Sequence, residues 1–239
     1  MSKRNLLLIY LCLTGIFALN GQNVTVIERN SAFTGSEKQK GFYYIEKDFP
    51  LTEDQWIATL DGFCTNTKKS NLESLFYIFR KTANEMGANA FFVKNFLNTT
   101  DTIFVAISIF KLTEQELDDN YKLYSCNKIY VFGDFIASDT KAKSREIKVN
   151  KKKVTVYPLS YYEHQSEIGE KVNVTIGGAF GSGYTRKAEA GKVSVYLSLG
   201  GGTVNPAVNA GGVGINFSTG SIYPLDMNLG QFLTNILNK

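Results

Sequence analysis

The stretch from Ser70 to Phe96 constrains the fold more than any other part of the chain. Ser70 followed by Glu73 forms a capping box, in which each side chain satisfies a free backbone amide at the start of a helix. Gly87 stands where a helix commonly ends in a left-handed residue, because glycine has no Cβ to clash there. Between these signals, apolar residues recur at intervals of three and four, which predicts one buried helix face. These residues are Leu72, Leu75, Phe76, Phe79, Ala83 and Met86.

A short apolar run from Ala90 to Val93 follows the glycine and is typical of a strand buried on both faces. A strand predicted at 56–63 precedes the helix, so the three segments form a β-α-β unit, for which a right-handed crossover is expected. Thr113 with Glu116 repeats the capping box and predicts a short helix over 114–121. Other strands before residue 137 are predicted at 23–28, 41–46, 102–112 and 129–135.

Composition changes near residue 137, where a polar and lysine-rich segment begins. Beyond it, strand-like runs are separated by glycine-rich connections, which is typical of a small antiparallel β-domain. These runs cover 153–162, 171–176, 192–199 and 212–217. The last segment has apolar residues on one helical face, with Asn228 as the candidate cap. A C-terminal helix packed on the β-domain is therefore expected, and a final strand is the alternative.

These patterns predict an α+β fold. We expect a signal peptide over 1–21, an α+β domain over 22–136 that contains the β-α-β unit, and a small antiparallel β-rich domain over 137–239.

The first 21 residues have the features of a secretory signal peptide. Lys3 and Arg4 form a basic start, and an apolar run of 14 residues follows from Leu6 to Leu19. Cleavage is expected after Gly21, and retention of an uncleaved leader is the alternative. No later segment is long and apolar enough to span a membrane as a helix. The sequence therefore predicts a secreted, periplasmic or envelope protein.

Without the leader the chain carries 24 basic and 22 acidic residues, a net charge of +2. Nucleic-acid-binding domains usually have a much stronger basic bias. We therefore expect no nucleic-acid partner.

Cys64 and Cys126 are the only cysteines after the leader. In an oxidising compartment two cysteines favour a single disulfide, which makes Cys64–Cys126 the candidate. Two separate buried thiols are the alternative, because the sequence does not give the distance between the Cα atoms.

A basic run covers the start of the second half and contains seven Lys or Arg residues. They are Lys141, Lys143, Arg145, Lys148, Lys151, Lys152 and Lys153. Such a patch could bind an anionic partner, for example a polysaccharide or a lipid headgroup. The alternation of lysines with Ile147, Val149 and Val154 also fits a solvated hairpin, in which edge lysines prevent strand-to-strand aggregation.

Familiar catalytic and cofactor motifs are lacking in the sequence. The glycine-rich stretch 177–183 is followed by neither a helix signal nor a Lys-Ser/Thr pair, so tight turns explain it better than a phosphate loop. A glycine zipper in a membrane is a further alternative for Gly177 and Gly181. His164 is the only histidine, and with two cysteines it falls short of a four-ligand zinc site. We expect no cofactor.

The junction Ala83-Asn84-Glu85-Met86-Gly87-Ala88-Asn89-Ala90 resembles one found in small bacterial envelope domains of the heavy-metal-binding β-α-β type. In that family a helix ends in Gly-Ala-Asn-Ala before a buried strand. The resemblance covers residues 56–96 and implies an α+β domain of envelope type. It implies no metal site here, because this stretch has no histidine.

The leading hypothesis is a secreted or envelope-associated protein that acts as a non-enzymatic binding or structural module, with an envelope component or anionic polysaccharide as partner. One alternative is a secreted hydrolase whose acidic residues lie in a cleft between the two halves. A second alternative is a self-associating or membrane-active protein built from glycine-rich strands.

Overall fold

The computed structural model describes residues 22–34, 37–65, 71–99, 102–135, 143–177, 181–200, 203–209, 212–218 and 220–237. The signal peptide predicted at 1–21 lies outside these ranges, as does Lys141 of the basic run. The described chain is mixed and mostly β, with three α-helices and several sheets, so the α+β expectation holds in broad terms.

Five strands form the sheet of the first half, in the order β1-β3-β5-β4-β2. They are β1 (Gln22–Arg29), β2 (Tyr43–Tyr44), β3 (Trp56–Thr65), β4 (Ala90–Asn98) and β5 (Thr102–Phe110). β5 lies antiparallel to both β3 and β4, which are therefore parallel to each other. The predicted order of strand, helix and strand is present, with β5 inserted between the two parallel strands. β2 pairs with β4 at one edge.

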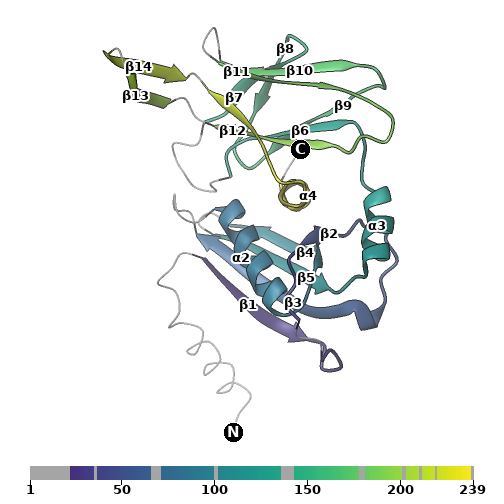
Figure 1. Cartoon of the computed structure of the whole chain (residues 1–239). Coiled ribbons are helices and arrows are strands. Elements are labelled where there is room, and N and C mark those ends of the chain that lie inside the picture. The colour runs from purple at the N-terminus through teal and green to yellow at the C-terminus, as the bar shows by residue number, and fades with distance from the viewer. Residues whose placement is uncertain are drawn as a thin grey trace.

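Helix α2 (Leu72–Glu85) packs on one face of this sheet (Figure 1). Its N-cap is Asn71, so the prediction of a cap at Ser70 was wrong. The Asn71 side chain accepts a hydrogen bond from the Ser74 amide at 2.8 Å, because a carboxamide oxygen caps as well as a hydroxyl. Ser70 itself lies outside the described residues.

The end of α2 is as predicted. Gly87 has φ of 87°, and the Ala88 amide donates to the Ala83 carbonyl at 2.9 Å, which is the Schellman arrangement. The predicted apolar stripe faces the sheet: all its members are buried except Met86, which packs at the margin.

Helix α3 (Glu114–Lys122) connects the two halves and has the predicted capping box. The Glu116 carboxylate accepts the Thr113 amide at 2.7 Å, and these hydrogen bonds hold the pKa of Glu116 below its ordinary value. A short 3-10 helix, η1 (Glu53–Gln55), precedes β3.

Two four-stranded sheets make up most of the second half, with orders β11-β10-β7-β8 and β15-β12-β6-β9. Their strands are β6 (Lys128–Phe132), β7 (Arg145–Val149), β8 (Lys152–Val156), β9 (Tyr161–Gln165), β10 (Lys171–Ile176), β11 (Ser182–Lys187), β12 (Val195–Gly200) and β15 (Ser221–Pro224). Their inner faces share a core that includes Val174, Ile147, Val131 and Leu197. A separate two-stranded sheet is formed by β13 (Thr203–Asn209) and β14 (Gly212–Ser218).

The basic run forms the predicted hairpin of β7 and β8. Asn150 and Lys151 occupy its tip with φ of 48° and 71°, the positive pair that a type I′ turn requires. The single strand predicted at 153–162 is divided into β8 and β9, because the chain turns at Leu159, where φ is 51°.

Strand β6 was predicted as part of the first half, but it pairs with β9 and β12 of the second. The predicted boundary at 136/137 therefore falls after a strand that belongs to a second-half sheet. Local alternation identifies such a strand without identifying its partners.

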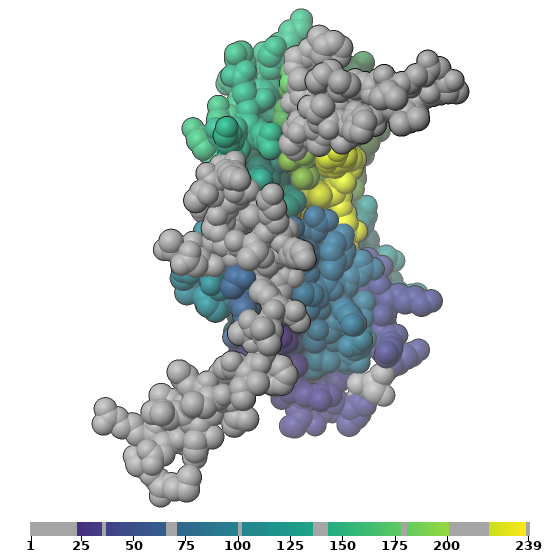
Figure 2. Space-filling model, turned by 90° about the vertical axis from the view of Figure 1, so that its left-hand side faces the viewer, coloured from purple at the N-terminus to yellow at the C-terminus, as the bar shows by residue number. Residues whose placement is uncertain are grey.

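Helix α4 (Met227–Ile236) is the predicted C-terminal helix, with Asp226 rather than Asn228 as its N-cap. It lies between the sheets of the two halves, where Figure 2 shows it in yellow above the blue surface of α2. Phe232 is fully buried, and its ring lies 5.4 Å from that of Phe76 between centroids. On another side of α4, an added Cβ at Gly230 would lie 2.1 Å from Cγ of Tyr196 on β12. A single core therefore extends from the first sheet through α4 to β6 and β12.

Candidate functional site

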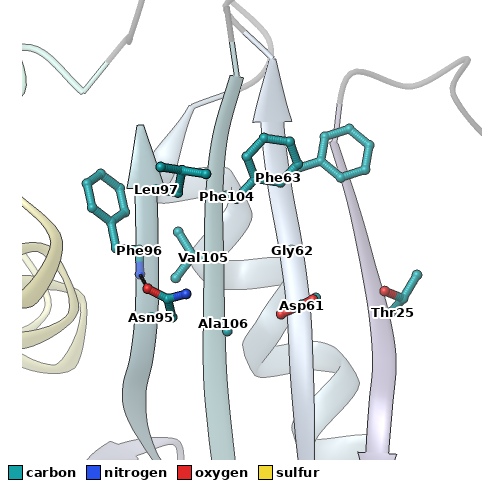
Figure 3. Close-up of a pocket in the computed structure, with 10 residues that line it drawn as sticks. All are labelled: Thr25, Asp61, Gly62, Phe63, Asn95, Phe96, Leu97, Phe104, Val105 and Ala106. Atoms are coloured by element: carbon teal, nitrogen blue, oxygen red, sulfur yellow. Dashed lines mark hydrogen bonds between the residues drawn. The ribbon is translucent and has the colours of Figure 1, made fainter. Parts of the chain in front are cut away.

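The face of the first sheet opposite α2 is open at one end of its central strands (Figure 3). A cavity of about 300 Å³ there is lined from β1, β3, β5 and β4. Phe63 and Phe104 face each other across β3 and β5 with ring centroids 6.2 Å apart, and Leu97 is paired with Phe104 from β4. Asp61 lies beside this apolar group, and partial burial raises the pKa of its carboxyl group. This shallow surface is an exposed apolar patch.

The other end of the same face is covered by the segment between β2 and β3. Phe49 and Leu51 of that segment pack against Phe110, Phe92 and Ile45 in a small separate core. A second cavity, of about 440 Å³, lies beside this segment. Its lining residues are Tyr44, Ile45, Glu46, Lys47, Phe49, Leu51, Phe92, Val93 and Asn235. The second cavity is called the junction cavity below, because α4 forms part of its wall.

On the outer edge of β2, side chains of α3 and α4 form the backbone hydrogen bonds that a neighbouring strand would otherwise form. Buried Asn120 donates to the Tyr44 carbonyl at 2.7 Å and accepts the Glu46 amide at 2.9 Å. Asn228 accepts the Tyr44 amide at 3.1 Å. The outer edge of β2 is therefore fully hydrogen-bonded, as a buried strand edge must be.

Glu46 is the one carboxylate that lines the junction cavity. Its Oε1 accepts a hydrogen bond from Gln231 Nε2 at 3.3 Å, and burial raises the pKa of the carboxyl group. Beside it, the Tyr44 hydroxyl donates to Asn235 Oδ1 at 3.2 Å, and burial raises the pKa of that phenol to about 12.

The outer face of the sheet formed by β7, β8, β10 and β11 carries most of the exposed lysines of the second half. Lys148 on β7 lies directly opposite Lys153 on β8, and Lys171 on β10 lies directly opposite Lys187 on β11. We call these four residues, with Lys151 at the hairpin tip, the lysine face. Lys153 forms an ion pair with Glu146 at 3.0 Å. The other four form no ion pair within the described residues.

A depression of about 430 Å³ lies within the lysine face. Lys148 and Lys151 border it, and Asn150, Asn173 and Thr175 complete its lining. Asn150 is fixed by hydrogen bonds to the Asn173 amide and to Glu170, each 2.9 Å long. The depression thus combines two cations with amide and hydroxyl groups.

The structure distributes the residues of the predicted basic patch over several positions. Lys148 and Lys153 share the outer face, whereas Arg145 and Lys152 pair with inward-facing Val156 and Val149 and so lie on the other side. Lys143 is exposed before β7, and Lys151 is at the tip. Sequence reasoning missed Lys171 and Lys187, which join the patch through strand pairing. The alternation of Lys171–Ile176 indicates which side of β10 is outward, and gives no information on its neighbours.

The predicted disulfide between Cys64 and Cys126 is absent, and both are free thiols. Cys64 is buried near the end of β3, where it pairs with Gln22 and Ile103. Cys64 is roughly 26 Å along β3 from Trp56. Trp56 pairs with the last residue of β5, and the chain continues from there to α3. Cys126 follows α3 and bridges to Val193 of the second half. A disulfide requires Cα atoms within about 7 Å, and Cys64 lies in the first sheet whereas Cys126 lies beside Val193 of the second half.

Thiol labelling checks this assignment. We expect iodoacetamide to modify Cys126 in the native protein and Cys64 only after unfolding, because Cys64 is buried and burial raises the pKa of its thiol to about 12. Peptide mass mapping after labelling in guanidinium without reductant should find both cysteines modified. If neither residue is modified under those conditions, they are bonded to each other.

The only histidine, His164, lies on β9 with Nε2 at 3.2 Å from Glu170 Oε1. Within the described parts of the chain, no group of three or more His, Cys, Asp or Glu residues is close enough to hold a metal ion. A helix long and apolar enough to cross a membrane does not occur among the described residues either.

Comparison with known protein families, curated proteins and solved structures finds no match to this chain.

Proposed function

We propose that the protein is a secreted or envelope-associated binding module, which holds an anionic polysaccharide on its lysine face. The predicted leader and the resemblance of residues 56–96 to envelope domains support the location. The mixed, sheet-rich architecture is compatible with a β-sandwich in the second half, a common scaffold for extended binding surfaces.

The observation that carries this proposal is a pair of like-charge contacts on one sheet face. Lysines directly opposite each other on adjacent strands repel and destabilise the sheet. Lys148 with Lys153 and Lys171 with Lys187 are two such pairs. Glu146 forms an ion pair with Lys153 of the first, and Glu189 interacts with Lys187 of the second without forming an ion pair. Carboxylate groups of a bound polymer would offset the repulsion of both pairs. The Asn and Thr side chains between the lysines suit the hydroxyl groups of a sugar.

Binding to polygalacturonate, a soluble acidic polysaccharide, tests the proposal. The triple variant Lys148→Gln, Lys171→Gln, Lys187→Gln should bind about threefold to a hundredfold more weakly, since each exposed charge contributes about 0.2–1 kcal/mol. Added salt should weaken binding by the native protein, because the contacts are exposed and screened.

The matched control removes three exposed lysines of the first half: Lys38→Gln, Lys40→Gln, Lys81→Gln. It loses the same charge and should bind like the native protein. Neutral dextran should not bind to either. Equal loss in both triple variants would mean that net charge, not the lysine face, attracts the polymer. No binding of polygalacturonate at low salt would refute the proposal.

A further inference from the structure

The junction cavity is separate from the lysine face and has features of a small-molecule site. Its volume of about 440 Å³ is within the range of ligand pockets. We propose that it binds an apolar α-amino acid. The ammonium group would lie on Glu46, the carboxylate on Lys47, and the apolar side chain against the aromatic wall of the cavity.

One hydrogen bond holds the backbone of Glu46 and another holds its carboxylate. The Glu46 amide is fixed by Asn120, and its Oε1 accepts from Gln231 of α4. No cation forms an ion pair with Glu46 in the described part of the chain. A partly buried carboxylate that has a hydrogen bond but no ion pair favours a cationic group, which would form a charge-assisted hydrogen bond.

The opposite charge comes from the neighbouring residue. Lys47 is exposed and lines the same cavity, so the site presents one anion and one cation side by side. A simple amine would be repelled by Lys47 and a simple carboxylate by Glu46. A zwitterion satisfies both groups, which makes an amino acid the complementary ligand class.

The rest of the wall is apolar. Phe49, Leu51 and Phe92 belong to the small core that covers the sheet, and Val93, which packs against the main core, completes the apolar lining. A ligand side chain here would remove apolar surface from water without displacing any polar group of the protein. Tyr44 and Asn235, already hydrogen-bonded to each other, close the side that faces α4.

Calorimetric titration with L-leucine, L-phenylalanine and L-tryptophan tests the site. At least one should bind saturably with a stoichiometry of one. Phenethylamine, which lacks the carboxylate, should bind about tenfold more weakly than L-phenylalanine, and 3-phenylpropionate, which lacks the ammonium group, more weakly still. The absence of saturable binding for all three amino acids at millimolar concentration would overturn the proposal. So would equal binding of 3-phenylpropionate and L-phenylalanine.

Two variants locate the binding. Glu46→Gln should lower the affinity for the amino acid at least about tenfold, since it removes a charge-assisted contact. Lys47→Gln should bind L-phenylalanine no better than phenethylamine, and because Lys47 is exposed this variant should fold normally. Far-UV circular dichroism checks the folding of both. Glu85→Gln changes an exposed acid at the end of α2 that does not line the cavity; it is the matched control and should bind like the native protein. Native affinity in Glu46→Gln would refute the assignment, whatever the result with the acidic polysaccharide.

Discussion

Replacing Phe232 with alanine is expected to lower the free energy of unfolding by about 3–5 kcal/mol. Phe232 is fully buried in α4, and its ring lies within 6.4 Å of those of Phe76, Phe79 and Phe91 between centroids. Alanine would leave a cavity where the helix meets both α2 and the first sheet. Urea denaturation followed by circular dichroism measures the loss.

The control for this substitution is Tyr157→Ala, which truncates an aromatic side chain that is 61% exposed. Its cost should stay within about 0.5 kcal/mol, as for most surface changes. A small effect at Phe232, comparable to that at Tyr157, would show that α4 is not part of the core.

Gly230→Ala in the same helix is expected to destabilise the protein, although alanine is the better helix former by about 1 kcal/mol. The added Cβ would lie 2.1 Å from Cγ of Tyr196. That ring is buried and stacked on Tyr130 at 5.0 Å between centroids, so it cannot easily turn away. Overpacking of this kind costs about 1–3 kcal/mol. If the cost is about 3 kcal/mol, the gain of about 1 kcal/mol in helix propensity leaves a net loss of about 2 kcal/mol in the free energy of unfolding.

A double-mutant cycle with Tyr196→Ala separates the two effects. In the Tyr196→Ala background, Gly230→Ala should cost less, because Cγ and Cδ1 of Tyr196, the two atoms that the added Cβ would meet most closely, have been removed. Thermal or urea unfolding of the four proteins gives the coupling. A stabilising effect of Gly230→Ala in the native background would contradict the close packing of α4 on β12.

Local features of this fold could be predicted from the sequence, because neighbouring residues determine them. The apolar stripe and Gly87 define α2 and its end, and Thr113 with Glu116 defines the start of α3. The N-cap of α2 was displaced by one residue because Ser70 and Asn71 are adjacent and both are good capping residues.

Features that depend on distant pairing could not be predicted. β6 has the alternation of any half-buried strand, and only tertiary contacts with β9 and β12 assign it to the second half. The cysteine pairing failed for the same reason: the sequence gives the spacing of Cys64 and Cys126 along the chain, and not the distance between them in space.

The candidate sites divide in the same way. The hairpin lysines were identified from their local alternation, whereas Lys171 and Lys187 join them through β10 and β11. Glu46 has no sequence signal at all, because its surroundings come from Asn120 of α3 and Gln231 of α4.

The position of α4 has a consequence for biosynthesis. The aromatic cluster that contains Phe76 and Phe91 also includes Phe232, which is translated much later. Contacts between residues so distant in the sequence form slowly, because a long loop must close first. We therefore expect the first sheet to expose apolar surface while the second half is still being made. A nascent chain in that condition is a natural substrate for chaperones that bind exposed apolar surface.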